Sequence, residues 1–161
     1  ERFAGASAAG VQRALPGPTG ERNVYRLEGR HAVLCLADDE RDRLAQLAAV
    51  LAVGSRALWP ESAEARALHA ALPPEVQPQV GFTPDWRSSE TTAFDAVLHH
   101  GSPGALRAVC EALAARPGAI VGVQGLAPGD AAIVLDRLLL ERSLSVNTAA
   151  AGGNAHLMTI G

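Results

Sequence analysis

Short apolar runs alternate with amphipathic segments along most of the chain, and this alternation predicts the fold. Ala32–Ala37 and Ala119–Val123 are uninterrupted apolar runs, which are typical of strands covered on both faces. Three further stretches have strand-like composition: Ser55–Trp59, Val80–Phe82 and Ala93–Leu98. We expect these segments to lie together in one sheet.

The segments between these runs have the spacing of amphipathic helices. We expect the first helix to be capped by Asp38 and to end at Gly54, with an acidic first turn that suits the helix dipole. Its apolar stripe follows i, i+3, i+4 and i+7 spacing: Leu44, Leu47, Ala48 and Leu51.

Three further helices have recognisable starts. Ser62 is the expected N-cap of one, which Pro73–Pro74 stops, and Ser102–Pro103 begins the next. Gly129–Asp130 would cap a last helix. The residues expected to face inward on these last two are Leu106, Val109, Cys110 and Leu113, then Ile133, Leu135, Leu138 and Leu139.

Strands that alternate with helices predict an α/β fold, a Rossmann-like parallel sheet with flanking helices. Glu21–Leu27 and Glu141–Asn147 lie outside this alternation. We expect them to pair as a projecting two-stranded β-ribbon, with Glu and Arg able to meet across the pair. The Ala-rich residues 1–15 suggest a short helix before a hinge at Pro16–Pro18.

The expected organisation has three parts. Residues 1–20 form a linker, residues 21–140 form the Rossmann-like domain, and residues 141–161 supply a ribbon strand followed by an extended C-terminal tail. The residues from 143 onward include no Asp, Glu, Lys or Arg, and their few large apolar groups cannot offset the entropy of ordering the segment. The tail therefore needs a surface already in place, unless it is simply a frayed terminus.

Composition narrows the function. The chain has 161 residues and a net charge of −3, and all 14 basic residues are Arg. Without Lys there is no P-loop lysine, Schiff-base lysine or lysine general base, and without a basic field nucleic-acid binding is not expected. No apolar run is long enough to cross a bilayer and no secretory leader opens the chain, so we expect a cytoplasmic protein. Because it begins at Glu1 without Met, we also expect it to be part of a longer protein.

The candidate chemical groups favour structural roles. His99 and His100 are adjacent on a predicted strand, so they point to opposite faces and cannot share a metal ion. Asp95 is expected to accept structural hydrogen bonds, and Cys35 and Cys110 to be buried thiols. We predict no catalytic residue, no cofactor-binding residue and no metal ligand in this chain.

A nucleotide site would need elements that are missing here. No GxGxxG turn follows Ala32–Ala37, and the acidic residues after it would repel a pyrophosphate at the helix N-terminus. Leu47–Ser62 looks like the nucleotide-binding half of aldehyde dehydrogenases, in which a Lys binds the ribose. Trp59 stands at that position and cannot donate to the ribose in the same way.

Two long motifs at the ends of the chain resemble the proline utilization A family. ERSLSVNTAAAGGN over Glu141–Asn154, closing on LMTIG over Leu157–Gly161, is similar to that family's extreme C-terminus. PGPTGERN over Pro16–Asn23 resembles the segment that enters its C-terminal domain, and the apolar runs between them fit in order. His156 departs from the pattern, which has a small residue such as Ser there.

The resemblance implies a non-catalytic, aldehyde-dehydrogenase-like C-terminal domain of a bifunctional enzyme. That enzyme would oxidise proline with FAD and glutamate semialdehyde with NAD, and neither cofactor is expected in this chain. The domain would pack on catalytic modules of its own polypeptide or of a neighbouring protomer, and its tail would help to close the cavity through which the intermediate passes. The expected lid and docking contacts are Ser143, Asn147, Thr148, Gly152, Gly153 and Asn154.

Two other functions stay open. One is a nucleotide-binding Rossmann domain with residual NAD affinity, which the acidic turn after the first buried strand argues against. The other is an oligomerisation module, in which the ribbon and tail join protomers instead of covering a cavity. The sequence leaves open whether docking occurs within one chain or between chains.

Overall fold

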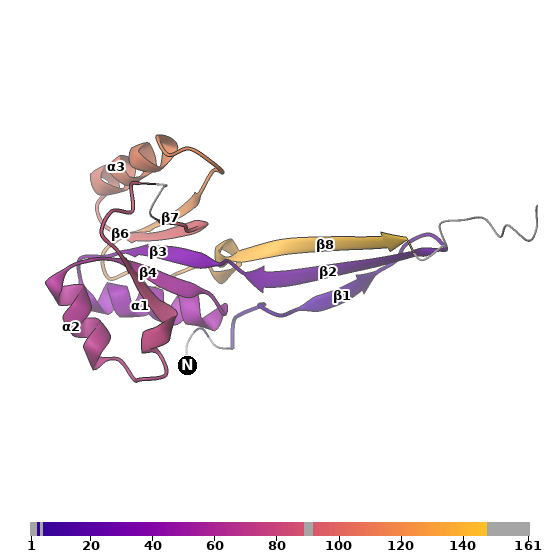
Figure 1. The fold of residues 1–161 in the computed structure, drawn as a ribbon, viewed down its shortest axis with the longest axis horizontal. Helices are drawn as coiled ribbons and strands as arrows, with labels where there is room; N and C mark the ends of the chain where they lie inside the picture. The colour runs from indigo at the N-terminus through magenta and orange to yellow at the C-terminus, as the bar shows by residue number, and fades with distance from the viewer. Residues whose placement is uncertain (1–2, 4, 89–91, 148–161) are drawn as a thin grey trace, which may run out of the picture.

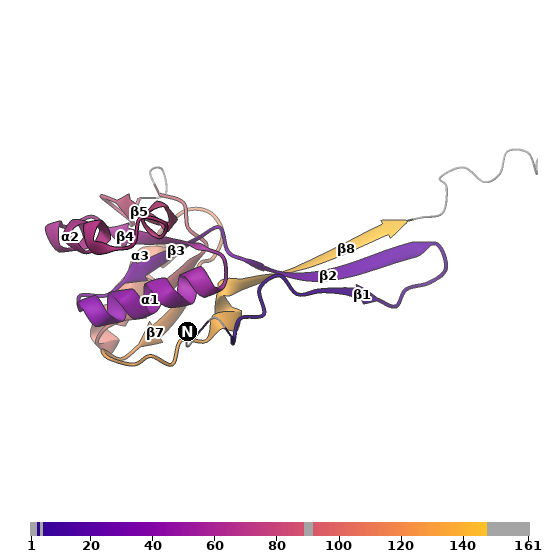
Figure 2. The same cartoon turned by 90° about the horizontal axis from the view of Figure 1, so that it is seen from below.

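The chain folds into an α/β body from which a long antiparallel sheet projects (Figure 1). The computed structural model describes residue 3, residues 5–88 and residues 92–147. Figures 1 and 2, viewed at right angles, both show the projecting sheet extending away from the body. The expected combination of a Rossmann-like sheet and a ribbon is confirmed.

The body is built on a parallel sheet with the strand order β5-β4-β3-β6-β7. Its strands in chain order are β3 (Ala32–Leu36), β4 (Arg56–Pro60), β5 (Val80–Thr83), β6 (Ala96–His100) and β7 (Gly122–Leu126). All four pairings are parallel. A parallel sheet needs cover on both faces, which explains the continuous apolar runs.

Helices cover the two faces of this sheet. They are α1 (Glu40–Ala52), α2 (Ala63–Ala71), α3 (Pro103–Ala114) and two 3₁₀ turns, η1 (Gln77–Gln79) and η2 (Leu135–Leu138). Alternation along β3 divides the core: Val33 and Cys35 pack with residues of α1 and α2, whereas Leu34 packs with Val109 of α3. Helices α1 and α2 therefore cover one face and α3 covers the other.

The predicted inward stripe of α1 is wrong. The N-cap is Asp39 rather than Asp38, and the buried positions are Asp42, Gln46, Leu47, Ala49 and Val50. Leu44 and Ala48 are exposed and Leu51 is half-buried, so only Leu47 of the predicted stripe is fully buried. Two polar side chains occupy the inner face because each bonds to backbone, Asp42 accepting from the amide of Gly129 and Gln46 Nε2 donating to the carbonyl oxygen of Leu36, and this rotates the helix away from its most apolar stripe.

Strands β6 and β7 each begin three residues later than predicted. Asp95 precedes β6, and its carboxylate accepts hydrogen bonds from the amides of His31 (3.3 Å) and Ala32 (3.2 Å). The predicted structural role of Asp95 is confirmed. Before β7, the side chain of Ile120 is fully exposed, so this apolar residue does not belong to the sheet.

Two predicted helices are wrong. After Gly129–Asp130 the chain runs irregularly to the short η2 turn. The side chain of Gln124 on β7 binds the backbone of Val134 and so occupies groups that a helix would use. Gln124 Oε1 accepts from the Val134 amide (2.7 Å), and Gln124 Nε2 donates to the Val134 carbonyl oxygen (3.3 Å). Ile133, Leu135, Leu138 and Leu139 are buried nonetheless. The Ala-rich N-terminal segment forms the strand β1 (Gln12–Leu15) instead of a helix.

The ribbon has three strands, not two. Strand β2 (Glu21–Gly29) pairs antiparallel with β8 (Leu139–Asn147) along its whole length, and β1 pairs on the other side of β2. The predicted pairing of the first and last strands is confirmed. An ion pair joins Arg142 Nε to Glu28 Oε2 at 3.4 Å, as expected of Glu and Arg across the pair.

Gly29 and Arg30 attach the ribbon to the body. A Cβ at Gly29 would overlap the carbonyl oxygen of Val53, so this crossing requires glycine. Arg30 donates from Nε to the carbonyl oxygen of Arg137 (3.2 Å) and from Nη1 to that of Asp95 (3.0 Å). These contacts tie the base of the ribbon to the η2 turn, which precedes β8, and to the residue before β6.

Replacing Gly29 by Ala is expected to destabilise the chain by about 1–3 kcal/mol, because the added methyl group meets backbone that cannot move aside. Thermal unfolding would measure this. Gly104→Ala is the matched control, since the nearest atom to its added Cβ is 3.9 Å away and outside the Gly29 crossing. Equal stability of the two variants would show that the crossing is not tight.

Candidate functional site

The register of the ribbon gives it two chemically different faces. Residues opposite each other in an antiparallel pair share a face, and successive residues alternate. The polar face carries Asn23, Tyr25, Ser143, Ser145 and Asn147, the charged residues Arg13, Glu21 and Glu141, and, toward its edges, Leu15, Leu27 and Leu139. The Arg/apolar face carries Arg22, Val24, Arg26, Arg142, Leu144 and Val146.

Two of the predicted contact residues lie on the polar face. Ser143 faces Tyr25 and Asn147 faces Glu21, both on exposed positions of β8. The other four, Thr148, Gly152, Gly153 and Asn154, lie outside the described residues, as does His156. The structure thus brings together two of the six on one surface, at the end of the ribbon from which the tail continues.

Tyr25 and Glu141 form the base of the polar face. Desolvation raises the pKa of Tyr25, and a hydrogen bond to Glu141 and the negative charge of that carboxylate raise it further. The tyrosine therefore stays a neutral hydroxyl at physiological pH. Beside the charged Arg13, Glu21 and Glu141, the surface offers hydroxyl and amide groups, which form hydrogen bonds without the desolvation cost of a buried charge.

A second candidate site is an open cleft of about 870 Å³ at the carboxyl ends of β3, β4 and β6. Rossmann-like folds bind their ligands at this edge of the sheet. Here the cleft is bordered by Asp38, Asp39, Glu64, Arg43 and His99.

At the start of α1, the Asp39 side chain already caps two of the amides that a ligand in this cleft would use. The Asp39 carboxylate accepts from the amides of Arg41 (2.8 Å) and Asp42 (3.3 Å). A phosphate placed there would compete with this cap and meet the negative charge of two carboxylates. This agrees with the sequence-based argument against a pyrophosphate.

Trp59 fills the space between the sheet and its helices. The ring is fully buried on β4, in edge contact with Phe82 (6.3 Å between centroids) and with the guanidinium of Arg43 5.8 Å from its centroid. Its Nε1 has no hydrogen-bond partner in the described part of the chain. The indole is therefore part of the hydrophobic core, at the position that resembles the ribose-binding Lys of aldehyde dehydrogenases.

A network that the sequence did not reveal closes one side of the cleft. The Asp42 carboxylate accepts from the amide of Gly129 through both oxygens (2.9 and 3.0 Å). Gln46 Nε2 donates to His100 Nδ1 (2.8 Å), and His100 Nε2 donates to the carbonyl oxygen of Asp130 (2.7 Å). These contacts hold the turn after β7 against α1. The only signal in the sequence was the pair of polar residues inside a helix.

His99 lies beside this network but outside it. It is 5% exposed and its Nδ1 has no partner among the described residues. Burial lowers the pKa of His99, and the charge of His100 lowers it further, against an opposing effect of Asp38. In the same described part of the chain, no group of three His, Cys, Asp or Glu residues is placed to hold a metal ion.

Stability should therefore fall as the pH drops below about 6.5. In the unfolded chain His99 titrates near its ordinary pKa of 6.5, whereas the folded chain takes up that proton only at lower pH. Urea unfolding between pH 7.5 and 5 would measure this, and His99→Asn should flatten the profile. His31→Asn, at an exposed site, is the control. Identical profiles for His99→Asn and the original chain would contradict the account.

The two cysteines differ, and one prediction about them is wrong. Cys35 is buried on β3 as expected, and burial raises its pKa to about 12. Cys110 is exposed on α3, because the sheet-facing side of that helix is centred on Val109. Both thiols are free.

A thiol reagent at pH 8 should therefore modify one cysteine in the native chain and two in denaturant, because thiolates react and a buried thiol stays protonated. Cys110→Ser should leave no reactive thiol in the native state. Rapid modification of two thiols without denaturant would contradict the burial of Cys35.

Comparison with known proteins identifies relatives over nearly the whole chain. No protein-family model matches. The chain is 60% identical over 163 residues to the bifunctional protein PutA of Salmonella typhimurium and 60% identical over 155 residues to that of Escherichia coli, covering 99% and 95% of this chain. The chain is related to PutA. It spans only 12% of the length of each of these two relatives.

Solved structures agree with this PutA relationship. A structure of proline utilization A with proline bound in remote sites matches with a TM-score of 0.56 and 27% identity, over 77% of this chain and 14% of that one. A putative aldehyde dehydrogenase from Burkholderia cenocepacia matches with a TM-score of 0.51 and 14% identity, over 77% of this chain and 28% of that one, which shows the shared fold alone. The resemblance seen in the end motifs is confirmed.

Proposed function

We propose that the chain is the non-catalytic C-terminal domain of a bifunctional proline-catabolic enzyme. Its ribbon and tail dock on the catalytic modules and close the cavity through which the intermediate between the two reactions passes. FAD and NAD would serve those modules, not this chain, and the whole enzyme would act in the cytoplasm. The similarity to PutA over nearly the full chain supports the assignment to that enzyme.

The polar face of the ribbon is the observation that carries the lid proposal. A surface that seals a cavity for a polar intermediate must hydrogen-bond to its partner without adding charges to the cavity. On β8, Ser143, Ser145 and Asn147 form an uncharged row with this chemistry, and the uncharged tail continues directly from them, whereas the charges of this face belong to Arg13, Glu21 and Glu141. Among the helices of the described residues, none has both the length and the apolar character of a bilayer span.

Two positions that would bind a dinucleotide are filled by side chains of this chain, which supports a non-catalytic role. The Asp39 cap and the buried Trp59 ring stand where a dinucleotide would need free amides and a ribose partner. Calorimetric titration with NAD is expected to give no saturable binding to this domain. Saturable binding of NAD to the folded domain would instead support a nucleotide-binding domain.

Truncation of the parent enzyme tests the lid. Removing the residues after Asn147 keeps the β2–β8 register and deletes only the tail. We expect both half-reactions to survive, while NADH formation from proline gains a lag because the intermediate escapes. Removing the residues after Arg142 should lengthen the lag, since it also deletes half of β8. Coupled kinetics without a lag in both truncations would contradict the lid.

An oligomerisation module is the second candidate, favoured by the exposed Leu144 and Val146 on the other face of the ribbon. In that case the truncated enzymes would sediment as smaller particles while the coupled reaction keeps its original time course. Sedimentation and coupled kinetics on the same samples separate the two functions.

A further inference from the structure

The cleft at the carboxyl ends of β3, β4 and β6 has an excess of negative charge at its border. The charged side chains around it are Asp38, Asp39, Asp42, Glu64, Arg43 and Arg87. Because the carboxylates outnumber the guanidiniums, the cleft attracts cations. Its volume of about 870 Å³ is large enough for a small organic molecule.

Two of these carboxylates remain available to a ligand. Asp39 caps α1 and Asp42 accepts from a backbone amide after β7, so both already have partners. Asp38 takes part in no hydrogen bond or ion pair with another described residue. Hydrogen bonds to its own backbone amide and to Ser62 lower the pKa of Glu64, so this exposed carboxylate keeps its charge near neutral pH.

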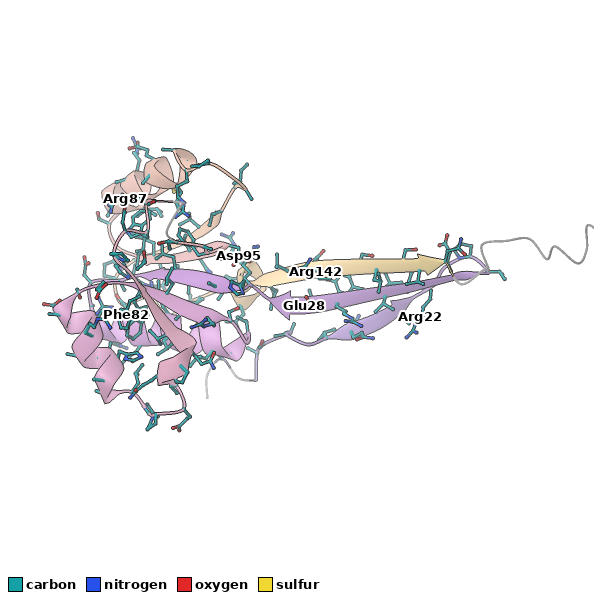
Figure 3. The ribbon with its side chains drawn as sticks, viewed as in Figure 1. Arg22, Glu28, Phe82, Arg87, Asp95 and Arg142 are labelled. Atoms are coloured by element: carbon teal, nitrogen blue, oxygen red, sulfur yellow. The ribbon has the colours of Figure 1, made fainter. Side chains whose placement is uncertain are left out.

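The two guanidiniums at the cleft are held by this chain. Arg43 donates from Nη2 to the carbonyl oxygen of Ala37 (2.8 Å) and lies 5.8 Å from the ring centroid of Trp59. Arg87 lies 4.3 Å from the ring centroid of Trp86, and Figure 3 shows it on the α3 side of the sheet. The cationic groups therefore have partners within the chain, and the carboxylates that remain favour a ligand of positive charge.

A buried histidine that lines the same cleft lacks a hydrogen-bond partner. The ring of His99 packs against Gly101, where an added Cβ would meet its Cε1 at 2.6 Å, and its Nδ1 has no partner among the described residues. Leaving a buried nitrogen unpaired costs free energy that a ligand donor would recover. The charge of Asp38 acts on His99, so a free carboxylate and a neutral imidazole border the same part of the cleft.

We propose that this cleft binds a small organic ammonium, the protonated form of a primary or secondary amine. Asp38, Glu64 and His99 accept its N–H groups. Its alkyl part lies against Ala105 and Ala108 of α3. The cleft belongs to the body and not to the ribbon, so its ligand is independent of the lid.

An ammonium fits this cleft better than a metal ion or a phosphate. Within the described ranges, no three His, Cys, Asp or Glu residues are placed to hold a metal ion. A phosphate would be repelled by the carboxylates at the start of α1. Ala105, Ala108 and Val109 also give the cleft an apolar wall, which suits an alkyl group and not a hydrated ion.

Thiol modification in the full-length parent tests the charge preference. Ala105→Cys places a thiol at the wall of the cleft, and Cys110, exposed on the same helix but outside the cleft, is the matched control. Trypsin separates the two thiols at Arg107, so mass spectrometry follows each one. Aminoethyl methanethiosulfonate carries an ammonium, whereas sulfonatoethyl methanethiosulfonate carries a negative charge.

We expect the ratio of the ammonium rate to the sulfonate rate to be about tenfold higher for Ala105→Cys than for Cys110. Asp38→Asn should lower this ratio toward that of Cys110, because it removes a carboxylate from the cleft. Glu75→Gln removes a carboxylate from an exposed position outside the cleft and should leave the ratio unchanged.

Protection by a free ammonium tests binding itself. Butylammonium chloride should slow the alkylation of Ala105→Cys by iodoacetamide, an uncharged reagent. Tetramethylammonium chloride at the same concentration has the charge but no N–H group, and should protect far less. Asp38→Asn, at an exposed site, and His99→Phe, which keeps a ring but removes its nitrogens, should each raise the half-protecting butylammonium concentration about tenfold.

Three results would overturn the proposal. Equal rate ratios at the two thiols, or a preference for the sulfonate in the cleft, would show that the cleft does not select cations. Absence of protection by butylammonium would show that no ammonium binds there. Equal protection by tetramethylammonium would show screening of charge alone. The coupled kinetics of the tail truncations are measured separately, so each of these results would leave the lid proposal standing.

Discussion

Pairing of β2 with β8 is the contact on which the arrangement of the whole molecule depends. It joins a strand near the beginning of the chain to the last described strand, so the whole parallel sheet lies within the loop that this pairing closes. Gly29 and Arg30 then fix the ribbon to the body. The same register decides which side chains share a face, and it carries the chain toward the tail from the far end of the ribbon.

The sequence predicted the features that depend on local chemistry and missed those that depend on contacts between distant segments. An apolar run located β3 and strand-like composition located β4, and Ser62 and Ser102 cap their helices as expected, because these features depend on local chemistry. The inner face of α1 could not be predicted, since Asp42 is buried by a hydrogen bond to Gly129, far along the chain. The last predicted helix failed for the same kind of reason.

The candidate site likewise has features that the local pattern predicted and features that it missed. The pairing of Glu21–Leu27 with Glu141–Asn147 placed Ser143 and Asn147 on one surface, and alternation alone would have assigned them to a common face. The third strand was missed, because an Ala-rich segment favours a helix until an open edge of β2 is available to pair with it. The unequal charge of the two ribbon faces became visible only with the register.

Photo-crosslinking from Ser143 in the full-length parent enzyme tests the central claim most directly. A short crosslinker on Ser143→Cys would report what the polar face touches, and peptides joined to it can be identified by mass spectrometry. The account predicts crosslinks to residues of the catalytic modules at the rim of the cavity between the two active sites. Crosslinks confined to this domain, or none above the level of a free surface cysteine, would contradict it.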